Sequence, residues 1–351
     1  EHSVNCNYPQ QGEMCMKKLL CAILIFAITL AFVSCSKSSI PGTPSPISEE
    51  TTFDSDTGDG SHKNDMTDTA DRLGITHLNY PRIDGSTSTL SIVRAINMAM
   101  YQSAENDNFP QTASKTVPSY KLLIEGKVDM IIVPYASSDI LAHAKDKGVK
   151  LEFYPIAAEA LVFITPKENE VENITMDQVR EIYVNYGIRN WSALGGPDRE
   201  LVPICRNSDS GSQSQMDNFI LKGKKMHPAI RKNYVELTME GMLEQVAFYH
   251  TGGLNRKPTN SYALGYTLYT YLKNMGEITG IDQRLKMLAF ESVVPSEESI
   301  ADGSYSLADA YYAVVRNDLP QGHSARIIIN WLKSEEGKAA IKELGLIPKD
   351  N

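Results

Sequence analysis

The stretch Arg206–Gln215, RNSDSGSQSQ, combines residue types that bind oxyanions. Arg206 stands four residues ahead of the turn Ser210-Gly211-Ser212, after which apolar positions at helical spacing predict a helix. A helix start presents unpaired backbone N–H groups and about half a positive charge, which together attract anions. Glycine lets the backbone approach a ligand closely, and a guanidinium adds bidentate hydrogen bonds to oxygens. The stretch therefore predicts one half of an anion clamp.

A second helix start has the same chemistry. The segment DGSTST, residues 84–89, follows a predicted strand and opens a predicted helix, so it combines a glycine, several hydroxyls and unpaired backbone N–H groups. A simpler interpretation stays open for both stretches, because Ser210 and Gln213 have the S-x-x-Q spacing of a capping box and could satisfy their own helix. Two such starts in one chain, together with an arginine, favour anion binding.

Strands and helices alternate along the chain from about residue 77 onwards, which is typical of βαβ units and a mainly parallel sheet. In such sheets, ligands bind where strands end and helices begin. About 270 residues exceed what one such sheet needs, so we predict two α/β lobes. Strands are expected at 78–84, 128–135, 149–156, 160–165, 201–205, 261–269 and 308–316, and helices at 90–100, 139–148, 175–187, 238–249, from 212 onwards, and as one long helix over 323–344.

The N-terminal region reads as a targeting segment. Met16-Lys17-Lys18, the mostly apolar run 19–33 and a small-residue stretch around Cys35 have the order of a signal peptide. The apolar run is shorter than the roughly 20 residues that a transmembrane helix needs. The letters AFVSC resemble a bacterial lipobox, which predicts lipidation of Cys35, with an ordinary signal peptide or a short membrane anchor as the alternative.

Residues 36–76 are rich in Ser, Thr, Pro and acidic residues and have few aliphatic ones, so we predict a disordered tether. Beyond Cys35 the sequence contains one cysteine, Cys205, so no disulfide is expected within that part. The expected segments are a leader at 1–35, the tether at 36–76, a first lobe at 77–161 and 304–351, and a second lobe at 162–303.

Other candidate sites are weak. The seven histidines are scattered and lack metal-ligand spacing, so no metal or cofactor is expected. Cys205 ends a predicted buried strand without a neighbouring base and reads as a structural thiol. Trp191, in NWSALGG, is expected to pack in the core. The net charge of -9 argues against nucleic acid as a partner.

From residue 78 to 350 the chain resembles the periplasmic phosphate-binding proteins of ABC transporters, which have the type II two-lobed solute-binding fold. The motifs that carry the resemblance are DGSTST, VDMIIVPYASSD, the block from YPIAAEALVFITP to NWSALGG, RNSDSGSQSQMDNFI, ALGYTLYTY, SYSLADAYYAVVR and IINWLKSEEGKAAIKELGLIP. The resemblance implies two mixed, mainly parallel sheets flanked by helices, with the ligand cleft between the lobes and crossing segments near 158–164 and 308–315.

The resemblance also implies ligand-binding residues in both lobes. The phosphate ligands that it implies are Gly85, Ser86, Thr87, Ser137, Arg206, Ser210, Gly211 and Ser212. Phosphate-specific members have an aspartate in the loop after the second strand that accepts the proton of hydrogen phosphate. Here that loop reads PYASSD, and Asp84, Asp139 and Asp209 are the candidate acceptors.

The implied function is a lipid-anchored receptor of the bacterial cell envelope. It would act as a monomer, close its lobes on phosphate, deliver the anion to a membrane permease of an ABC transporter, and catalyse no reaction. One alternative keeps the fold and binds another small anion, or serves as a surface sensor or adhesion protein. A phosphoesterase is the third hypothesis, although the sequence lacks an evident nucleophile–base pair or metal cluster.

Overall fold

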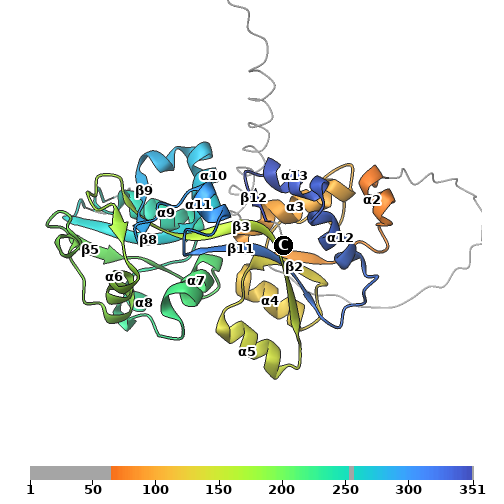
Figure 1. The fold of residues 1–351 in the computed structure, drawn as a ribbon, viewed down its shortest axis with the longest axis horizontal. Helices are drawn as coiled ribbons and strands as arrows, with labels where there is room; N and C mark the ends of the chain where they lie inside the picture. Colours follow the sequence, from red (N-terminus) through yellow and green to blue (C-terminus); the bar gives the residue numbers. More distant parts are fainter. Residues whose placement is uncertain (1–64, 253–256, 350–351) are drawn as a thin grey trace, which may run out of the picture. The chain divides into compact units, whose positions relative to one another are not determined.

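The computed structural model describes residues 65–252 and 257–349, and residues 64–351 form one compact unit. Cys35, the predicted leader and most of the predicted tether lie outside the described residues. The fold is α/β, with a long mixed sheet that continues through two lobes (Figure 1). Among the described residues, none of the helices is both long enough and apolar enough to span a bilayer.

The first lobe contains one half of the mixed sheet and the helices that cover it. Its strands are β1 (Ile83–Gly85), β2 (Met130–Pro134), β3 (Leu151–Pro166), β11 (Ala308–Arg316) and β12 (Ile347–Pro348). Its helices are α2 (Asp68–Leu73), α3 (Leu90–Met100), α4 (Thr116–Ile124), α5 (Ser138–Asp146), α12 (Ser324–Leu332) and α13 (Glu335–Glu343). β1 and β2 pair in parallel, so both of their carboxyl ends reach the same edge of the sheet.

The second lobe continues the sheet through the second half of β3. Its strands are β5 (Glu200–Pro203), β8 (Ser261–Leu268) and β9 (Leu285–Met287), with two short pairs formed by β4 (Asn173–Ile174) with β10 (Ala289–Phe290) and by β6 (Cys205–Arg206) with β7 (Val235–Glu236). Its helices are α6 (Met176–Arg180), α7 (Gly211–Met216), α8 (Pro228–Asn233), α9 (Met239–Phe248), α10 (Tyr269–Thr279) and α11 (Glu297–Ala301).

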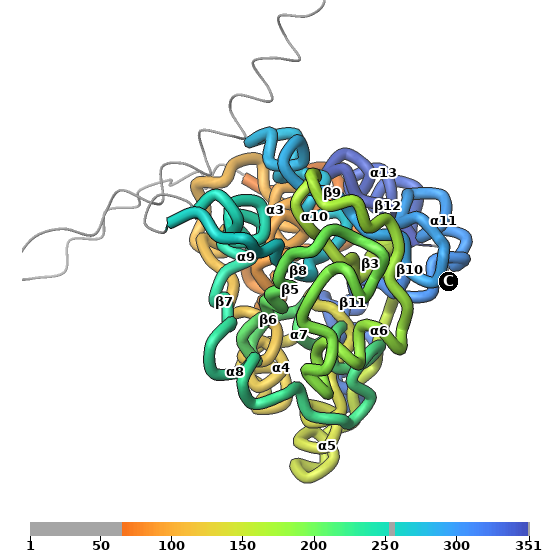
Figure 2. The backbone as a smooth tube through the Cα atoms, turned by 90° about the vertical axis from the view of Figure 1, so that its left-hand side faces the viewer, coloured from red at the N-terminus to blue at the C-terminus, as the bar shows by residue number. Residues whose placement is uncertain are grey.

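Strand β3 joins the lobes. It pairs with β11 up to Ala160 and with β8 from Leu161 onwards, so its partner changes inside the predicted crossing segment 158–164. β3 and β11 run side by side in both views (Figures 1 and 2). The sequence predicted two strands at 149–156 and 160–165, and this prediction is wrong because the backbone stays extended through both. The pairs that β3 and β11 make with one another and with β2 and β8 are antiparallel, so the sheets are mixed.

The buried apolar side chains form separate cores. One large cluster lies within 158–307 and fills the second lobe around Phe163, Trp191 and Tyr266. Two further clusters cover opposite parts of the first-lobe sheet, one around Ile132 and one around Ile131. Neighbouring residues of a strand point to opposite faces, so helices on both faces of β2 each obtain a core of their own.

The predicted long helix over 323–344 is wrong, because two helices occupy that range. α12 ends at Leu332, and α13 begins after Ser334, whose side chain accepts a hydrogen bond from the Gly337 N–H. A Cβ atom on Gly337 would lie 2.2 Å from the carbonyl oxygen of Trp331, so only glycine permits the close turn between the helices.

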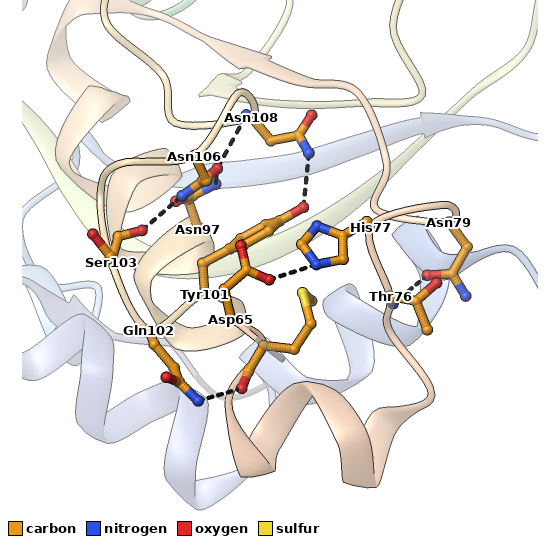
Figure 3. Close-up of polar contacts among 11 residues, drawn as sticks. Asp65, Thr76, His77, Asn79, Asn97, Tyr101, Gln102, Ser103, Asn106 and Asn108 are labelled. Carbon is orange, nitrogen blue, oxygen red and sulfur yellow. Dashed lines mark hydrogen bonds and ion pairs between the residues drawn. The ribbon is translucent and has the colours of Figure 1, made fainter. Parts of the chain in front are cut away.

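The structure also corrects the end of the predicted tether, because residues 65–76 are folded. α2 begins after Thr67, whose hydroxyl accepts a hydrogen bond from Ala70 N–H, and Ala70 is fully buried. In Figure 3, His77 Nε2 lies 2.5 Å from Asp65 Oδ1, and Asn108 donates a hydrogen bond of 2.7 Å to the Tyr101 hydroxyl. This polar cluster holds the first described residues against the end of α3.

Candidate anion-binding site

The start of α7 lacks the capping box that its sequence allows. Ser210 is the N-cap residue, but its side chain makes no capping hydrogen bond, and its hydroxyl lies 3.0 Å from that of Ser212. Gln213 instead accepts a hydrogen bond from the Tyr266 hydroxyl and donates one of 2.8 Å to Asp217. The simpler interpretation of this stretch is therefore wrong, and α7 presents its first turn without a capping side chain.

Arg206 is a buried cation beside this helix start. It is 4 % exposed, and no carboxylate within 65–252 or 257–349 forms an ion pair with it. Its Nε and Nη2 donate hydrogen bonds of 3.2 Å to the carbonyl oxygens of Glu236 and Leu237. Burial lowers the pKa of Arg206, which shows the cost of holding this charge away from water. An anion would supply the missing counter-charge.

A hydrogen-bond network fixes Arg206 relative to α7. The Arg206 N–H donates to the Tyr266 hydroxyl at 3.0 Å, and the same hydroxyl donates to Gln213 on the first turn of α7. Tyr266 is fully buried in the second-lobe core. The backbone of Arg206 and the first turn of α7 are thus joined through one buried side chain, and the guanidinium is held separately by the Glu236 and Leu237 carbonyl oxygens.

The first-lobe helix start over 84–89 is partly used by its own hydrogen bonds. Thr89 Oγ1 accepts the Ser86 N–H at 2.9 Å, so the capped-helix interpretation holds here. Ser86 is buried, whereas Thr87 is exposed, which separates two residues predicted to bind together. A Cβ atom on Gly85 would lie 2.9 Å from the Ile132 carbonyl oxygen, so this glycine is needed for the packing of β1 on β2.

Thr116 is a site residue that the sequence analysis missed. It is the first residue of α4 and fully buried, and its hydroxyl has no hydrogen-bond partner among the described residues. A buried hydroxyl without a partner is costly, and a ligand oxygen would satisfy it. Its segment, TASKT, has no glycine, and nothing in the sequence distinguishes it from an ordinary helix start.

The residue before Thr116 has a strained backbone. Lys115 is the N-cap of α4 and adopts φ 75° and ψ 169°, a region that glycine occupies almost alone. Such a conformation costs about 1–3 kcal/mol and is concentrated at binding sites. Asp84 holds this turn, because its Oδ1 accepts the Ser114 N–H at 3.2 Å and its Oδ2 lies 2.7 Å from Ser119 Oγ. The predicted proton acceptor Asp84 is therefore occupied by hydrogen bonds within the first lobe.

The loop after β2 contributes Ser137, which is buried at the N-cap of α5 and whose side chain makes no capping hydrogen bond. Asp139, on the first turn of α5, is exposed. Burial, and to a lesser extent the Asp139 charge, raise the pKa of Asp217 in the second lobe. Asp209 is half-buried and has no hydrogen bond or ion pair within the described ranges.

The two lobes are in contact at the start of α7. A Cβ atom on Gly211 would lie 2.8 Å from Cγ of Pro134 and 3.0 Å from the hydroxyl oxygen of Thr116. The start of α7 therefore lies directly against the end of β2 and the start of α4. The structure brings together Thr116 from the first lobe and the turn at Gly211 from the second.

Trp191 and Cys205 are both buried in the second-lobe core. Trp191 is fully buried and donates a hydrogen bond of 2.9 Å to the Tyr262 carbonyl oxygen, which confirms its packing role. Burial raises the pKa of Cys205 to about 11, so its thiol stays protonated at neutral pH, as a structural cysteine does.

Known proteins share this architecture. A substrate-binding protein from Clostridium perfringens, solved with bound phosphate, superposes with a TM-score of 0.57 at 22% identity, over 76% of this chain and 98% of that one. An ABC-type phosphate transport receptor from Vibrio cholerae gives a TM-score of 0.55 at 22% identity, with the same coverage of 76% and 98%. The phosphate-binding protein PstS of Borreliella burgdorferi is 26% identical over 218 residues, which cover 61% of this chain and 71% of that protein.

The structural likeness confirms the two-lobed periplasmic-binding-protein fold that the motifs implied. The family model described as "PBP superfamily domain" matches residues 68–336, which include the second lobe, most of the first lobe and all the described residues of the candidate site. The protein is therefore a member of the PBP superfamily domain family.

Proposed function

We propose that this protein is the substrate-binding component of an ABC transporter, that it captures inorganic phosphate between its lobes, and that it delivers the anion to a membrane permease. The observation that carries the proposal is the buried guanidinium of Arg206, which has no carboxylate partner within the described ranges. The backbone of the same residue is linked through Tyr266 to the uncapped first turn of α7. The names of the PstS relative and of the two solved structures support phosphate as the ligand.

The proposed ligand groups come from both lobes. Ser86, Thr116 and Ser137 would contribute hydroxyls from the first lobe, and α7 would contribute backbone N–H groups from the second. Phosphate would neutralise Arg206 and satisfy the unpartnered hydroxyl of Thr116. Thr87 and Asp139 are exposed at the surface. We therefore propose that their side chains contribute less to phosphate binding than the resemblance implied.

A second candidate ligand is a fully ionised oxyanion such as sulfate. A carboxylate that accepts the proton of hydrogen phosphate is the group that rejects sulfate. Asp84 is occupied by Ser114 and Ser119, and Asp139 is exposed. Asp209 is the predicted proton acceptor that is neither hydrogen-bonded within the described residues nor fully exposed. The discrimination between phosphate and sulfate would therefore depend on Asp209.

Isothermal titration calorimetry of the purified protein with phosphate, and separately with sulfate, tests the proposed function. The protein is first freed of any anion carried through purification. We expect saturable binding of one phosphate per chain, because one cluster of anion-binding groups joins the lobes. Sulfate binding of equal strength would replace phosphate by the second candidate, and a lack of binding of either anion would contradict both.

We propose that the protein acts as a monomer at the bacterial cell envelope and is anchored through lipid on Cys35. We also propose that it binds its ligand without transforming it. The protonated thiol of Cys205 supports this view, as does the mutual hydrogen bond of the Ser210 and Ser212 hydroxyls, since neither arrangement activates a nucleophile.

A further inference from the structure

One face of the segment that begins with α7 is directed towards the first lobe. Gly211 touches Pro134 and Thr116, and Gln215 lies four residues further on, one helical turn along the same face. The segment continues as a π-helical turn over Asp217–Leu221, which contains Asn218. Figure 1 shows α7 at the edge of its lobe that lies nearest to α4 and β2. Met216 and Ile220, by contrast, are fully buried in the second-lobe core.

Gln215 connects this face to the crossing strand β11. Its side chain is 1 % exposed, and its Nε2 donates a hydrogen bond of 3.2 Å to Asp309 Oδ2. The other carboxylate oxygen of Asp309 accepts the Tyr312 hydroxyl at 2.7 Å. The Tyr312 ring packs against Tyr135 of the first lobe, with ring centroids 5.4 Å apart. The Asp309 carboxylate, which accepts the hydrogen bond from Gln215, is therefore fixed through Tyr312 to the first lobe.

Asn218 makes a second connection. Its Nδ2 donates a hydrogen bond of 3.3 Å to the carbonyl oxygen of Ala136, in the loop between β2 and α5. That loop also carries Ser137, a proposed phosphate ligand. Asn218 and Gln215 thus join the second lobe to the segments of the first lobe that surround the site, although neither is among the groups proposed to touch the anion.

The bond of Gln215 leaves part of its amide unsatisfied. Its Oε1 is buried and has no hydrogen-bond partner among the described residues. A buried acceptor without a partner carries a desolvation penalty that opposes the gain from the other bond. This penalty offsets part of the stabilisation that the hydrogen bond to Asp309 provides.

We propose that Gln215 and Asn218 form a polar latch, which holds the start of α7 against the first lobe and thereby sets the rate at which a bound anion is released. The inference rests on the proposed function, because it concerns the same site. Gln215 and Asn218 act as positioning residues, and the binding groups are those of the proposed phosphate site.

The test compares the variants Gln215→Ala, Asn218→Ala and Gln215→Glu with the wild type by stopped-flow measurement of phosphate association and dissociation. Each alanine variant is expected to raise the dissociation rate about two- to tenfold, the effect of one ordinary hydrogen bond, and to leave association within about twofold. Gln215→Glu places a carboxylate against Asp309, so its dissociation rate should exceed that of Gln215→Ala.

The matched control is Ser214→Ala. Ser214 is on the same helix and equally buried, but its hydroxyl donates to the Ser210 carbonyl oxygen at 3.3 Å, within its own helix. It should leave dissociation within about twofold, since it removes no contact between the lobes. Unchanged dissociation in both alanine variants, in a protein that binds phosphate, would overturn the latch and leave the proposed function intact.

A second readout needs no anion. Hydrogen–deuterium exchange of the ligand-free variants reports how often residues 134–140 and 211–221 separate. The latch predicts faster exchange of both segments in Gln215→Ala and Asn218→Ala than in Ser214→Ala, with the exchange of the second-lobe core unchanged. Equal exchange in all three variants would contradict the latch even if the wild type bound no phosphate.

Discussion

Arg206→Met is expected to abolish most phosphate binding while the fold keeps its stability. The guanidinium is 4 % exposed and has no carboxylate partner within the described residues, so phosphate would be its counter-charge. Removing one partner of a buried charge pair typically costs about 2–5 kcal/mol, which is a loss of at least about thirtyfold in affinity by calorimetry. The ligand-free protein is relieved of a buried, unneutralised cation, so we expect its denaturation midpoint to be no lower than that of the wild type.

The control for this variant is Arg180→Met. The Arg180 Nε also donates a hydrogen bond to a backbone carbonyl oxygen, that of Ile220, at 2.9 Å, so the control removes an arginine with a similar structural contact. It should leave the phosphate affinity within about threefold, because its charge lies outside the proposed site. A variant Arg206→Met that bound phosphate normally but unfolded much more easily would make Arg206 a structural residue.

Gly211→Val is expected to keep the lobes apart. The added Cβ would lie 2.8 Å from Cγ of Pro134 and 3.0 Å from the Thr116 hydroxyl oxygen, both in the opposite lobe. The least costly relief is a more open cleft, which separates the Thr116 hydroxyl from the start of α7. Displacements of about 1 Å cost enzymes about a hundredfold in rate, and we expect a loss of phosphate affinity of similar size by calorimetry.

Gly322→Val is the matched control for this change. Gly322 lies outside regular secondary structure, and a Cβ atom there would meet no atom of the described residues within 4 Å. The phosphate affinity of the Gly322→Val variant should match that of the wild type. Wild-type affinity in Gly211→Val as well would show that the lobes do not need this contact to hold the anion.

Much of the fold could be predicted from local patterns. The run 128–135 is apolar because both faces of β2 are covered by helices, and the structure buries all five residues of that strand. The merging of 149–156 with 160–165 into β3 could not be predicted, since its extended backbone depends on strands more than a hundred residues away. The division between α12 and α13 depends on Gly337, whose close contact with Trp331 has no signal in the helical pattern.

The sequence predicts those parts of the candidate site whose residue types themselves indicate anion binding. Arg206 and the turn at Ser210 are recognisable because arginine, hydroxyls and glycine occur together before a helix. The expected capping box does not form, because the Gln213 side chain accepts a hydrogen bond from Tyr266, which is 53 residues further along the chain. Such competition between local and distant hydrogen bonds has no sequence signature.

Thr116 was missed for a related reason. Its importance comes from burial without a partner and from the contact with Gly211, and both depend on how the lobes meet. The strained conformation of Lys115 marks the site in the structure. A sequence reader would expect glycine at such a position and would pass over a lysine.

A crystal structure of the protein grown with phosphate tests the central claim most directly. The account predicts one phosphate between the lobes, with oxygens about 2.6–3.2 Å from the Arg206 guanidinium, the Thr116 hydroxyl and the backbone N–H groups at the start of α7. Phosphate bound elsewhere, or lobes closed over a site in which Arg206 contacts only the carbonyl oxygens of Glu236 and Leu237, would contradict it.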